Sequence, residues 1–400
     1  MLLRHLTLEN FRNIARLDLE VPPGRTVLYG DNAQGKTNLL EAVSMFAAAK
    51  SVRADHDRDL LSWAVHGDTI PYTRVAGTIA RSKDEVRVEI VLQLGSQEEA
   101  EAAPGPLSTR HLLKRTKVNG VPRRAGDFVG EVQAVLFEPQ DIELVYGPPS
   151  LRRRHLDLTL SQVDRPLLRE LQRYNRVLAQ RNSLIKSVRE GKASPGELTF
   201  WDGELIEAGS FIVEARARAV SEVSETAQSI HSDLTAGRET LRLVYRPSLD
   251  VAAGAGRDSV KETFAETLES LREREIAAGT TLVGPHRDDM AFEIDGVGLA
   301  AFGSRGQHRL ATLSLKLAEA RFMTSRTGEE PLLLLDDVLS ELDEFRRGFL
   351  LESISQYGQS ILTTADLPSL DRDFRSQANL LRVIDGRVEP PDCAGYDRRA

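Results

Sequence analysis

The sequence predicts an α/β fold in which both ends of the chain build one domain and a helical segment is inserted between them. Two observations lead to this prediction. Residues 1–94 and 332–364 contain short apolar or alternating runs that end in turn residues, as strands do. Residues 150–236 instead carry apolar side chains at intervals of three and four, which is the spacing of one helix face. We therefore expect a discontinuous α/β domain of residues 1–149 and 280–400, with a helical arm domain of residues 150–279.

The first fifty residues predict strands followed by one helix. Residues 1–21 alternate between apolar and polar side chains, and residues 22–24 are a Pro-Pro-Gly turn. Residues 25–29 then form a short apolar run that leads into a glycine loop. Residues 38–50 have apolar side chains at helical spacing, so we expect a helix directly after that loop.

The following segment predicts an antiparallel β subdomain over about residues 70–130. Residues 70–94 alternate again between apolar and polar side chains. The Asn119-Gly120 pair is the strongest short-range signal for a tight hairpin. Residues 97–106 are rich in Glu, Ala and Pro, which predicts a loose surface loop.

The last part of the chain returns to mixed β and α patterns. We expect a strand at 241–245 and a charged helix at 258–276. Two further apolar strands follow at 332–335 and 360–364, and Asp385-Gly386 marks a late hairpin.

Composition places the chain among ordinary globular proteins. Of its 400 residues, 41% are hydrophobic and 28% charged, which excludes a disordered or collagen-like chain. The net charge is −8, so nucleic acid binding would need a local basic patch on an acidic body. A single cysteine, Cys393, excludes a disulfide framework and fits a reducing compartment. We see no signal peptide or membrane-spanning run and expect a cytoplasmic protein.

A phosphate-binding loop follows the strand at 25–29. Residues 30–37 match the pattern G-x-x-x-x-G-K-[ST] in full, with a strand before and a helix after. In such a loop, backbone N–H groups point at phosphate oxygens and the helix N-terminus adds partial positive charge. Lys36 would contact the β- and γ-phosphates and Thr37 would ligate Mg²⁺, which predicts ATP with Mg²⁺ as the ligand. The residues expected to bind nucleotide here are Gly30, Asp31, Asn32, Ala33, Gln34, Gly35, Lys36 and Thr37.

Two acids at the end of the apolar strand 332–335 supply the second half of such a site. In phosphate-loop proteins a carboxylate at this place holds the Mg²⁺ shell, a role that falls to Asp336. Asp337 then lies where a general base orients the attacking water. We expect Asp337 and Lys36 to be the catalytic residues.

A third motif narrows the class of ATPase. Ser304-Arg305-Gly306-Gln307 precedes a helix at 310–321 and resembles the S-x-G-Q signature of the ABC and SMC ATPases. Residues 339–343 resemble their D-loop, and Thr364 stands where a switch histidine is usual. The order of these motifs along the chain resembles an ABC/SMC-type P-loop ATPase head. In that superfamily the serine and the helix start cap the γ-phosphate bound by the other subunit, which implies roles for Ser304, Gly306 and Gln307.

Over nearly its full length the chain resembles the RecF family of bacterial recombination and gap-repair ATPases. The stretches that carry this resemblance are residues 8–13, 30–37, 51–53, 137–142, 147–157, 284–289, 304–307 and 336–337. The helical insertion is short, whereas SMC proteins place long coiled coils between the two ATPase halves. The resemblance implies that Arg12 and Asn13 meet adenine or the α-phosphate and that Arg53 lies near the phosphates. It also makes Gln140 the candidate for the glutamine that senses Mg²⁺ and the attacking water.

The resemblance further implies a mechanism and partners. Two copies would dimerise head to tail on ATP and clamp duplex DNA near single-strand gaps, at junctions of single and double strands. Slow hydrolysis, in keeping with the short side chain of Asp337, would release the clamp. RecR-like and RecO-like proteins would be the partners in loading a recombinase.

Two basic clusters are the candidate DNA contacts. Residues 102–126 contain no acid and carry Arg110, Lys114, Arg115, Lys117, Arg123 and Arg124. Arg152 and Arg153 form a second cluster at the start of the helical arm. Basic side chains without a base-reading motif suit phosphate contacts. For both clusters a solvated face is the alternative, and for some of Arg152–Arg154 internal pairing with Asp157 or contact with the sheet is another.

Three further alternatives remain open on the sequence. His286, Arg287, Asp288 and Asp289 predict a hydrogen-bonded structural knot, with a metal site as the less favoured interpretation. The ATP-binding subunit of an ABC transporter shares the site motifs but has no use for a helical arm and a basic hairpin. A P-loop kinase for a small molecule would have no use for the S-x-G-Q segment.

Overall fold

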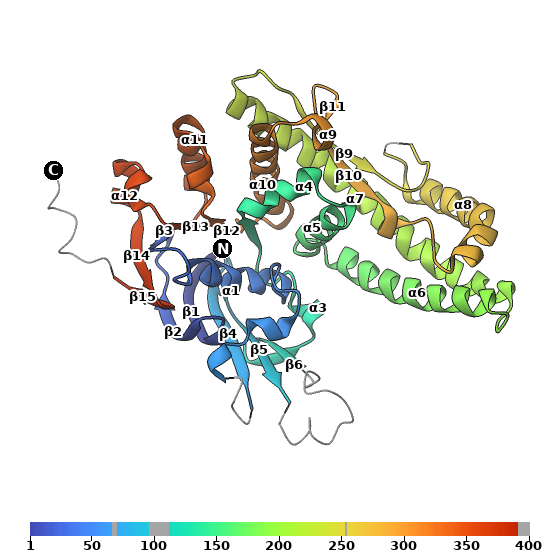
Figure 1. Cartoon of the computed structure of the whole chain (residues 1–400), viewed down its shortest axis with the longest axis horizontal. Helices are drawn as coiled ribbons and strands as arrows, with labels where there is room; N and C mark the ends of the chain where they lie inside the picture. The colour runs from blue at the N-terminus through green and yellow to red at the C-terminus, as the bar shows by residue number, and fades with distance from the viewer. Residues whose placement is uncertain (66–69, 96–111, 253, 391–400) are drawn as a thin grey trace. The chain divides into compact units, whose positions relative to one another are not determined.

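A computed structural model describes residues 1–65, 70–95, 112–252 and 254–390 (Figure 1). The predicted loop at 97–106, Arg110 and Cys393 lie outside the described residues. The chain divides into two compact units, unit 1 of Met1–Pro139 with Met323–Ala400 and unit 2 of Gln140–Phe322. The limits of these units differ from the domain limits expected above, because residues 140–149 and 280–322 pack with the helices of unit 2. The division into a functional head and arm stays a prediction.

Unit 1 contains an antiparallel sheet formed by the N-terminal third of the chain. Its six strands lie in the order β2-β1-β4-β5-β6-β7, with the predicted Asn119-Gly120 hairpin between β6 and β7. The sheet includes β1 and β2 from outside residues 70–130, so a separate β subdomain with those limits stays a prediction. Both hairpin residues have positive φ, as the tight turn requires. The strands are β1 (Leu2–Phe11), β2 (Ile14–Glu20), β4 (Tyr72–Ala80), β5 (Glu85–Leu94), β6 (Leu112–Val118) and β7 (Val121–Arg123).

A second sheet in unit 1 joins strands from both ends of the sequence. Its order is β15-β14-β3-β13-β12-β8, and all neighbours are parallel except β14 and β15. Because parallel strands end at the same edge of a sheet, residues that follow β3, β8, β12 and β13 are brought together there. The strands are β3 (Gly24–Tyr29), β8 (Ala134–Phe137), β12 (Leu332–Asp336), β13 (Gln359–Thr364), β14 (Asn379–Ile384) and β15 (Arg387–Glu389).

Helix α1 (Lys36–Ala48) fills the core of unit 1. It contacts β1, β4 and β5 of the first sheet and β8, β12 and β13 of the second, so nearly all of its residues are buried. The first sheet packs closely against α1 because Gly77 on β4 has no side chain. A Cβ at this position would lie 2.7 Å from the Phe46 ring of α1. The other short helices of unit 1 are η1 (Asp57–Leu60), η2 (Trp63–Val65), α3 (Ala125–Phe128), η6 (Val338–Glu341), α11 (Glu344–Ser355), η7 (Leu367–Ser369) and α12 (Arg372–Gln377).

Unit 2 is mainly helical, as the sequence predicts for its middle part. Helices α6 (Arg165–Arg189) and α7 (Leu198–Thr235) lie side by side (Figure 1), and α7 also contacts α8 (Arg257–Ala278). A small antiparallel sheet in the order β11-β10-β9 packs on α7. Among the described helices, none combines the length and apolar character needed to cross a bilayer. The remaining elements are η3 (Pro139–Ile142), α4 (Glu143–Tyr146), α5 (Pro149–Ser161), η4 (Pro195–Glu197), β9 (Leu241–Arg246), η5 (Pro285–Arg287), β10 (Asp289–Ile294), β11 (Val297–Gly298), α9 (Leu299–Phe302) and α10 (Arg305–Thr327).

A fully buried arginine ties the helices of unit 2 together. The Arg181 side chain has no exposed surface and donates to Asp202 on α7 and Glu275 on α8, each at 2.7 Å. It also donates to the Thr281 hydroxyl at 2.8 Å. A buried arginine is tolerated only when its donors are satisfied in this way, so removal of either acid would leave part of the guanidinium without a hydrogen-bond partner.

Residues 284–289 form a hydrogen-bonded knot in unit 2, the interpretation favoured from the sequence. Asp288 accepts hydrogen bonds from the Tyr245 hydroxyl and from the Ser248 N–H group at 2.8 Å. The Tyr174 hydroxyl lies 2.7 Å from Nδ1 of His286, whose Nε2 lies 3.3 Å from the Thr281 carbonyl. Across the described ranges, no cluster of three or more His, Cys, Asp or Glu side chains has the geometry of a metal site.

The knot predicts acid sensitivity of unit 2. Burial lowers the pKa of His286 to about 4, whereas an unfolded histidine takes up its proton near pH 6.5. The unfolded chain therefore binds more protons between these two values, so the stabilisation is present above about pH 6.5 and is lost as the pH falls toward 4. We expect a loss on the order of 2 kcal/mol in the free energy of unfolding, measured by urea unfolding at several pH values.

His286→Gln is the matched variant for this measurement. A glutamine can accept from Tyr174 and donate to the Thr281 carbonyl but does not titrate, so its pH dependence should be flatter by the same amount. The carboxylates are identical in the two proteins and cancel in the difference. If the free energies of unfolding of the wild type and His286→Gln change with pH in parallel, His286 is excluded as the source of the acid sensitivity.

Candidate nucleotide-binding site

The phosphate-binding loop lies between β3 and α1, as its pattern predicts. Gly30 has a φ of 149°, and a Cβ at this position would lie 2.4 Å from the Val383 carbonyl oxygen. Gly35 has a φ of 108°, and a Cβ there would meet the Asn13 side chain at 2.9 Å. Both glycines are therefore required by backbone conformation and by close neighbours.

The turn between β14 and β15 supports the loop from the other side. The Gly386 N–H donates to the Gln34 carbonyl at 2.8 Å, and the Asp385 N–H donates to the Gln34 side-chain oxygen at 2.7 Å. Asn13 accepts from the Asn38 amide at 2.8 Å on the opposite side. Two segments distant in the sequence thus hold the loop, while Asp31, Asn32 and Ala33 at its tip are exposed.

Lys36 is buried at the start of α1, with its ammonium group inside the loop. Its Nζ donates to the carbonyls of Gly30 at 2.6 Å and Asp31 at 2.7 Å. Burial lowers the pKa of Lys36, while the nearby Asp337 and Asp336 act in the opposite direction. The ammonium group therefore lies in a partly desolvated place, where its attraction for an anion is stronger than at the surface.

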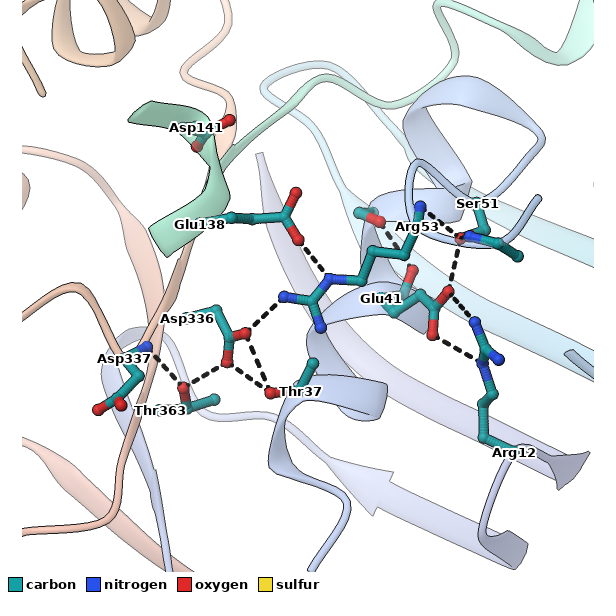
Figure 2. A network of polar contacts seen from close by, with 12 residues as sticks. Arg12, Thr37, Glu41, Ser51, Arg53, Glu138, Asp141, Asp336, Asp337 and Thr363 are labelled. Carbon is teal, nitrogen blue, oxygen red and sulfur yellow. Dashed lines mark hydrogen bonds and ion pairs between the residues drawn. The ribbon is translucent and has the colours of Figure 1, made fainter. Parts of the chain in front are cut away.

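Asp336 at the end of β12 is the centre of the polar network in Figure 2. The Thr37 hydroxyl donates to its two carboxylate oxygens at 2.8 and 3.0 Å, and the Thr363 hydroxyl donates at 2.7 Å. The hydroxyl of Thr37 and the carboxylate of Asp336 are the two oxygen donors that the sequence assigns to Mg²⁺, and the structure brings them together. Oxygen donors of this kind are the ligands that Mg²⁺ prefers.

Asp337 lies next to this centre in a sparsely populated backbone conformation. Its φ is 50°, and its N–H donates to the Thr363 hydroxyl at 2.9 Å. Burial raises the pKa of its carboxyl group, and repulsion by Asp336 raises it further. Strained non-glycine residues and perturbed carboxylates both cluster at functional sites, in keeping with the predicted role.

Arg53 joins Asp336 to an acid that the sequence did not single out. Its guanidinium donates to Asp336 at 2.5 Å and to Glu138, the residue that follows β8 (Figure 2). Burial would lower the pKa of Arg53, but the two carboxylates more than offset this and raise it. The structure therefore places Arg53 at the predicted metal-binding carboxylate, in a pair of charge-assisted hydrogen bonds.

A second buried acid, Glu41 on α1, holds Arg12 and the loop before Arg53. The Glu41 side chain is 1% exposed and accepts two hydrogen bonds from Arg12, at 2.8 and 3.0 Å. It also accepts from the Ser51 hydroxyl at 2.5 Å, and that oxygen in turn accepts from the Arg53 N–H at 2.9 Å. One carboxylate therefore fixes both arginines that the family resemblance assigns to the nucleotide.

Two other predicted residues lie outside this network. Thr364 is buried at the end of β13 and accepts from the Asp366 N–H at 3.1 Å, while its neighbour Thr363 is the one that contacts Asp336. Gln140 is exposed in η3, where unit 2 begins. The roles of Thr364 as switch residue and Gln140 as sensor stay predictions.

The signature segment (Ser304–Gln307) lies in unit 2 at the start of α10. The Ser304 hydroxyl accepts from the Gln307 N–H at 3.2 Å, and the Gln307 side-chain oxygen accepts from the Ser304 N–H at 2.9 Å. This reciprocal pair is the arrangement of a capping box, which satisfies two N–H groups at a helix start. Ser304 and Gly306 are exposed.

Strand register divides the basic residues of β6 between two faces. Lys114 lies opposite the buried Leu92 and pairs with Asp57 at 2.8 Å, so it points into the covered face of the sheet. Arg115 lies opposite Val91 and is exposed, with no acid paired to it among the residues described. Lys117 shares the face of Arg115 and lies 3.5 Å from Glu89. Arg123 is exposed but lies opposite Thr116, so it shares the face of Lys114, and the exposed Arg124 follows β7.

Arg152 contradicts one prediction, whereas the DNA contact expected of Arg153 stays a prediction. Arg152 is 7% exposed and donates to Asp289 at 2.6 and 2.9 Å and to the Gly147 carbonyl at 2.6 Å. Arg153 donates to the Asp288 carbonyl at 2.7 Å. Because the donors of Arg152 are used inside unit 2, it offers nothing to a DNA phosphate, and internal pairing, the open alternative, is what the structure has. The partner is Asp289 instead of the suggested Asp157, which pairs with Arg216.

Comparison with known proteins agrees with this site. A family model described as "RecF/RecN/SMC N terminal domain" matches residues 2–372. The DNA replication and repair protein RecF of Roseiflexus castenholzii is 41% identical over 403 residues, covering 98% of this chain and 100% of that relative. The RecF protein of Chloroflexus aurantiacus is 40% identical and covers 97% and 99%. A solved structure of the recombination mediator protein RecF-ATP of the RecFOR pathway has a TM-score of 0.85 at 30% identity, covering 98% of this chain and 97% of that one.

Glu41 generates a prediction for the site. Glu41→Gln keeps the shape of the side chain but removes the charge that pairs with Arg12, so we expect the free energy of unfolding to fall by about 2 kcal/mol. The affinity for ATP should fall about tenfold, because the Arg12 and Ser51 segments lose their shared anchor. Thermal unfolding and titration with a fluorescent ATP analogue measure the two effects.

Glu20→Gln is the control, because Glu20 is an exposed acid on β2 in the antiparallel sheet of the same unit. It should leave both quantities unchanged. Unchanged ATP affinity in Glu41→Gln would show that the anchor stabilises unit 1 but does not serve the nucleotide.

Proposed function

The chain belongs to the RecF family of SMC-like ATPases, and on this premise we propose that it is an ATP-dependent DNA-binding protein of recombinational repair and replication. The single observation that carries the proposal is the convergence of the phosphate-binding loop, Thr37 and Asp336 at one edge of the parallel sheet. Such a site is built for a nucleoside triphosphate.

ATP is the proposed nucleotide, and the ATP-bound RecF structure supports it. The loop N–H groups and the Lys36 ammonium would bind the phosphates, while Arg12 and Arg53 would approach from the Glu41 side. Thr37 and Asp336 would hold Mg²⁺, and the ion would neutralise phosphate charge when bound.

Hydrolysis would depend on Asp337. Its raised pKa makes the carboxylate a better proton acceptor than an exposed aspartate, so it suits the orientation of an attacking water. We propose that hydrolysis is slow, because an aspartate reaches less far than the glutamate common at this place. A slow step of this kind acts as a timer for release of DNA.

Two copies are proposed to close on ATP head to tail. The exposed signature segment of one copy would contact the γ-phosphate in the loop of the other. The Ser304 oxygen already accepts from Gln307, so its own proton is left to donate to a phosphate oxygen. The closed pair would clamp DNA near single-strand gaps.

The exposed face of the first sheet is the proposed DNA contact. Arg115 and Lys117 on this face, with the exposed Arg124 just after β7, suit sequence-independent phosphate contacts. Lys114 and Arg123 are not part of this set because strand register puts them on the other face. RecR-like and RecO-like proteins are the proposed partners in loading a recombinase, supported by the RecFOR pathway named for the solved relative.

The two other functions considered from the sequence, a transporter subunit and a small-molecule kinase, are less well supported. The curated relatives matched over nearly the full chain are DNA replication and repair proteins, which does not favour the transporter subunit. A small-molecule kinase has no use for the capped signature segment. The family therefore favours the DNA clamp among the three.

The dimer is tested by sizing the protein with and without ATP. We expect the wild type to shift from monomer to dimer on ATP and Mg²⁺, and more completely when gapped DNA is added. Lys36→Ala should stay monomeric because it no longer binds ATP. Ser304→Arg should bind ATP as a monomer but fail to dimerise, because a bulky cation replaces the serine at the proposed contact.

Wild-type protein that stays monomeric with ATP and gapped DNA would contradict the clamp. ATP-dependent dimers whose formation is unaffected by gapped DNA would instead favour the transporter class.

The DNA surface is tested by salt dependence. Replacing Arg115, Lys117 and Arg124 by alanine should lower the slope of log affinity against log salt by about 3, near one for each phosphate that the protein no longer neutralises. Lys114→Ala is the matched control from the same strand and should leave the slope unchanged. An equal reduction in Lys114→Ala would show that register does not decide which residues meet DNA. Fluorescence anisotropy of a labelled gapped duplex at several salt concentrations measures the slope.

A further inference from the structure

The Gln307 amide of the signature segment is held at both of its ends. Its oxygen accepts from the Ser304 N–H at 2.9 Å, within the capping box. Its Nε2 donates to Oε1 of Glu239 at 3.0 Å. A glutamine near a helix start normally retains rotational freedom, whose loss on binding weakens an interaction. In this structure the hydrogen bond to Glu239 already restricts the Gln307 side chain before any partner binds.

Glu239 is itself fixed by a buried histidine. Its other oxygen, Oε2, lies 3.1 Å from Nε2 of His231, which is 0% exposed in the last turns of α7. Nδ1 of the same ring lies 3.2 Å from the Ser314 hydroxyl on α10. The side chain that holds Gln307 is therefore bound to α7 and, through His231, to α10, the helix that carries the signature segment.

From these contacts we propose that Glu239 is a positioning residue for ATP-dependent dimerisation. It holds the Gln307 amide, Gln307 holds the Ser304 N–H, and the Ser304 hydroxyl stays oriented toward the phosphate of a second copy. The inference rests on the proposed head-to-tail dimer and adds a residue that touches neither nucleotide. No motif of the sequence marks Glu239, since it lies far from residues 304–307 in the chain.

The direction of the change in dimer strength distinguishes a positioning role of Glu239 from an effect of its negative charge. Glu239 is an anion near a segment that meets a triphosphate, so removal of its charge alone would strengthen the contact. Positioning predicts the reverse, because Gln307 loses its acceptor. We expect Glu239→Ala to raise the protein concentration at half-dimerisation by about tenfold, since hydrogen bonds to charged groups have this size or more.

Two further substitutions make the assignment specific. Glu239→Gln loses the charge but keeps an acceptor oxygen for Gln307, so it should dimerise nearly as the wild type does. Glu239→Asp keeps the charge but withdraws the acceptor by about 1.5 Å, one carbon–carbon bond, so it should be weakened like Glu239→Ala. Asp233→Ala is the control, because Asp233 is an exposed acid on α7 with no ion pair to the described residues.

The experiment measures dimerisation by analytical ultracentrifugation of the full chain with a slowly hydrolysed ATP analogue and Mg²⁺. ATP affinity at concentrations where the protein is monomeric, and the thermal midpoint, are measured on every variant. The proposal expects weakened dimers in Glu239→Ala and Glu239→Asp, with monomer ATP affinity kept within twofold. A thermal midpoint near the wild-type value shows that the Glu239→Asp protein is folded.

Dimers of normal strength in folded Glu239→Ala and Glu239→Asp, beside a wild type that dimerises, would overturn this inference alone. Equal weakening of Glu239→Gln and Asp233→Ala would also overturn it, because loss of the acceptor for Gln307 would then not explain the effect. A wild type that stays monomeric would overturn the proposed function and this inference with it.

Discussion

The site depends on one carboxylate, Asp336, and on the parallel sheet that places it. Thr37, Thr363 and Arg53 all donate to this side chain, and they come from α1, from β13 and from the loop after α1. A parallel sheet brings them together because its strands end at a common edge. The same edge carries the phosphate-binding loop after β3. A shift of β12 by one residue would turn Asp336 to the opposite face and separate all three contacts.

The polar interior of both units follows a common rule. Buried charges are matched by opposite charges within hydrogen-bond distance, as Arg181 is by Asp202 and Glu275, and Glu41 is by Arg12. Such pairs add little net stability compared with an apolar core, but each half is costly to leave alone. They therefore restrict how the helices and loops can be arranged. In the nucleotide site, this restriction holds Arg12 and Arg53 in place.

The sequence predicted most strands and helices because periodicity and turn residues are local signals. It also predicted the phosphate loop, Thr37 and Asp336, since these residues lie in a fixed spacing next to a strand. It failed where pairing between distant segments decides the outcome. Glu138 and Glu41 carry no motif, and only the packed sheets reveal that they hold Arg53 and Arg12. In the sequence Arg152 cannot be distinguished from an exposed cation, and only the structure reveals its ion pair with Asp289. Alternation along β6 was a signal that was available: it separates Lys114 from Arg115 and Lys117.

The position of β3 has a consequence for how the protein is made. Its two neighbours in the sheet are β13 and β14, which come far later in the sequence than β3 does. Val27, for example, pairs with Leu362 and Leu380. The nascent chain therefore carries its glycine-rich loop on an unpaired, apolar strand until β13 and β14 have been synthesised. Contacts of such long sequence separation form slowly, so the ability to hold a triphosphate matures only after these two distant strands have emerged.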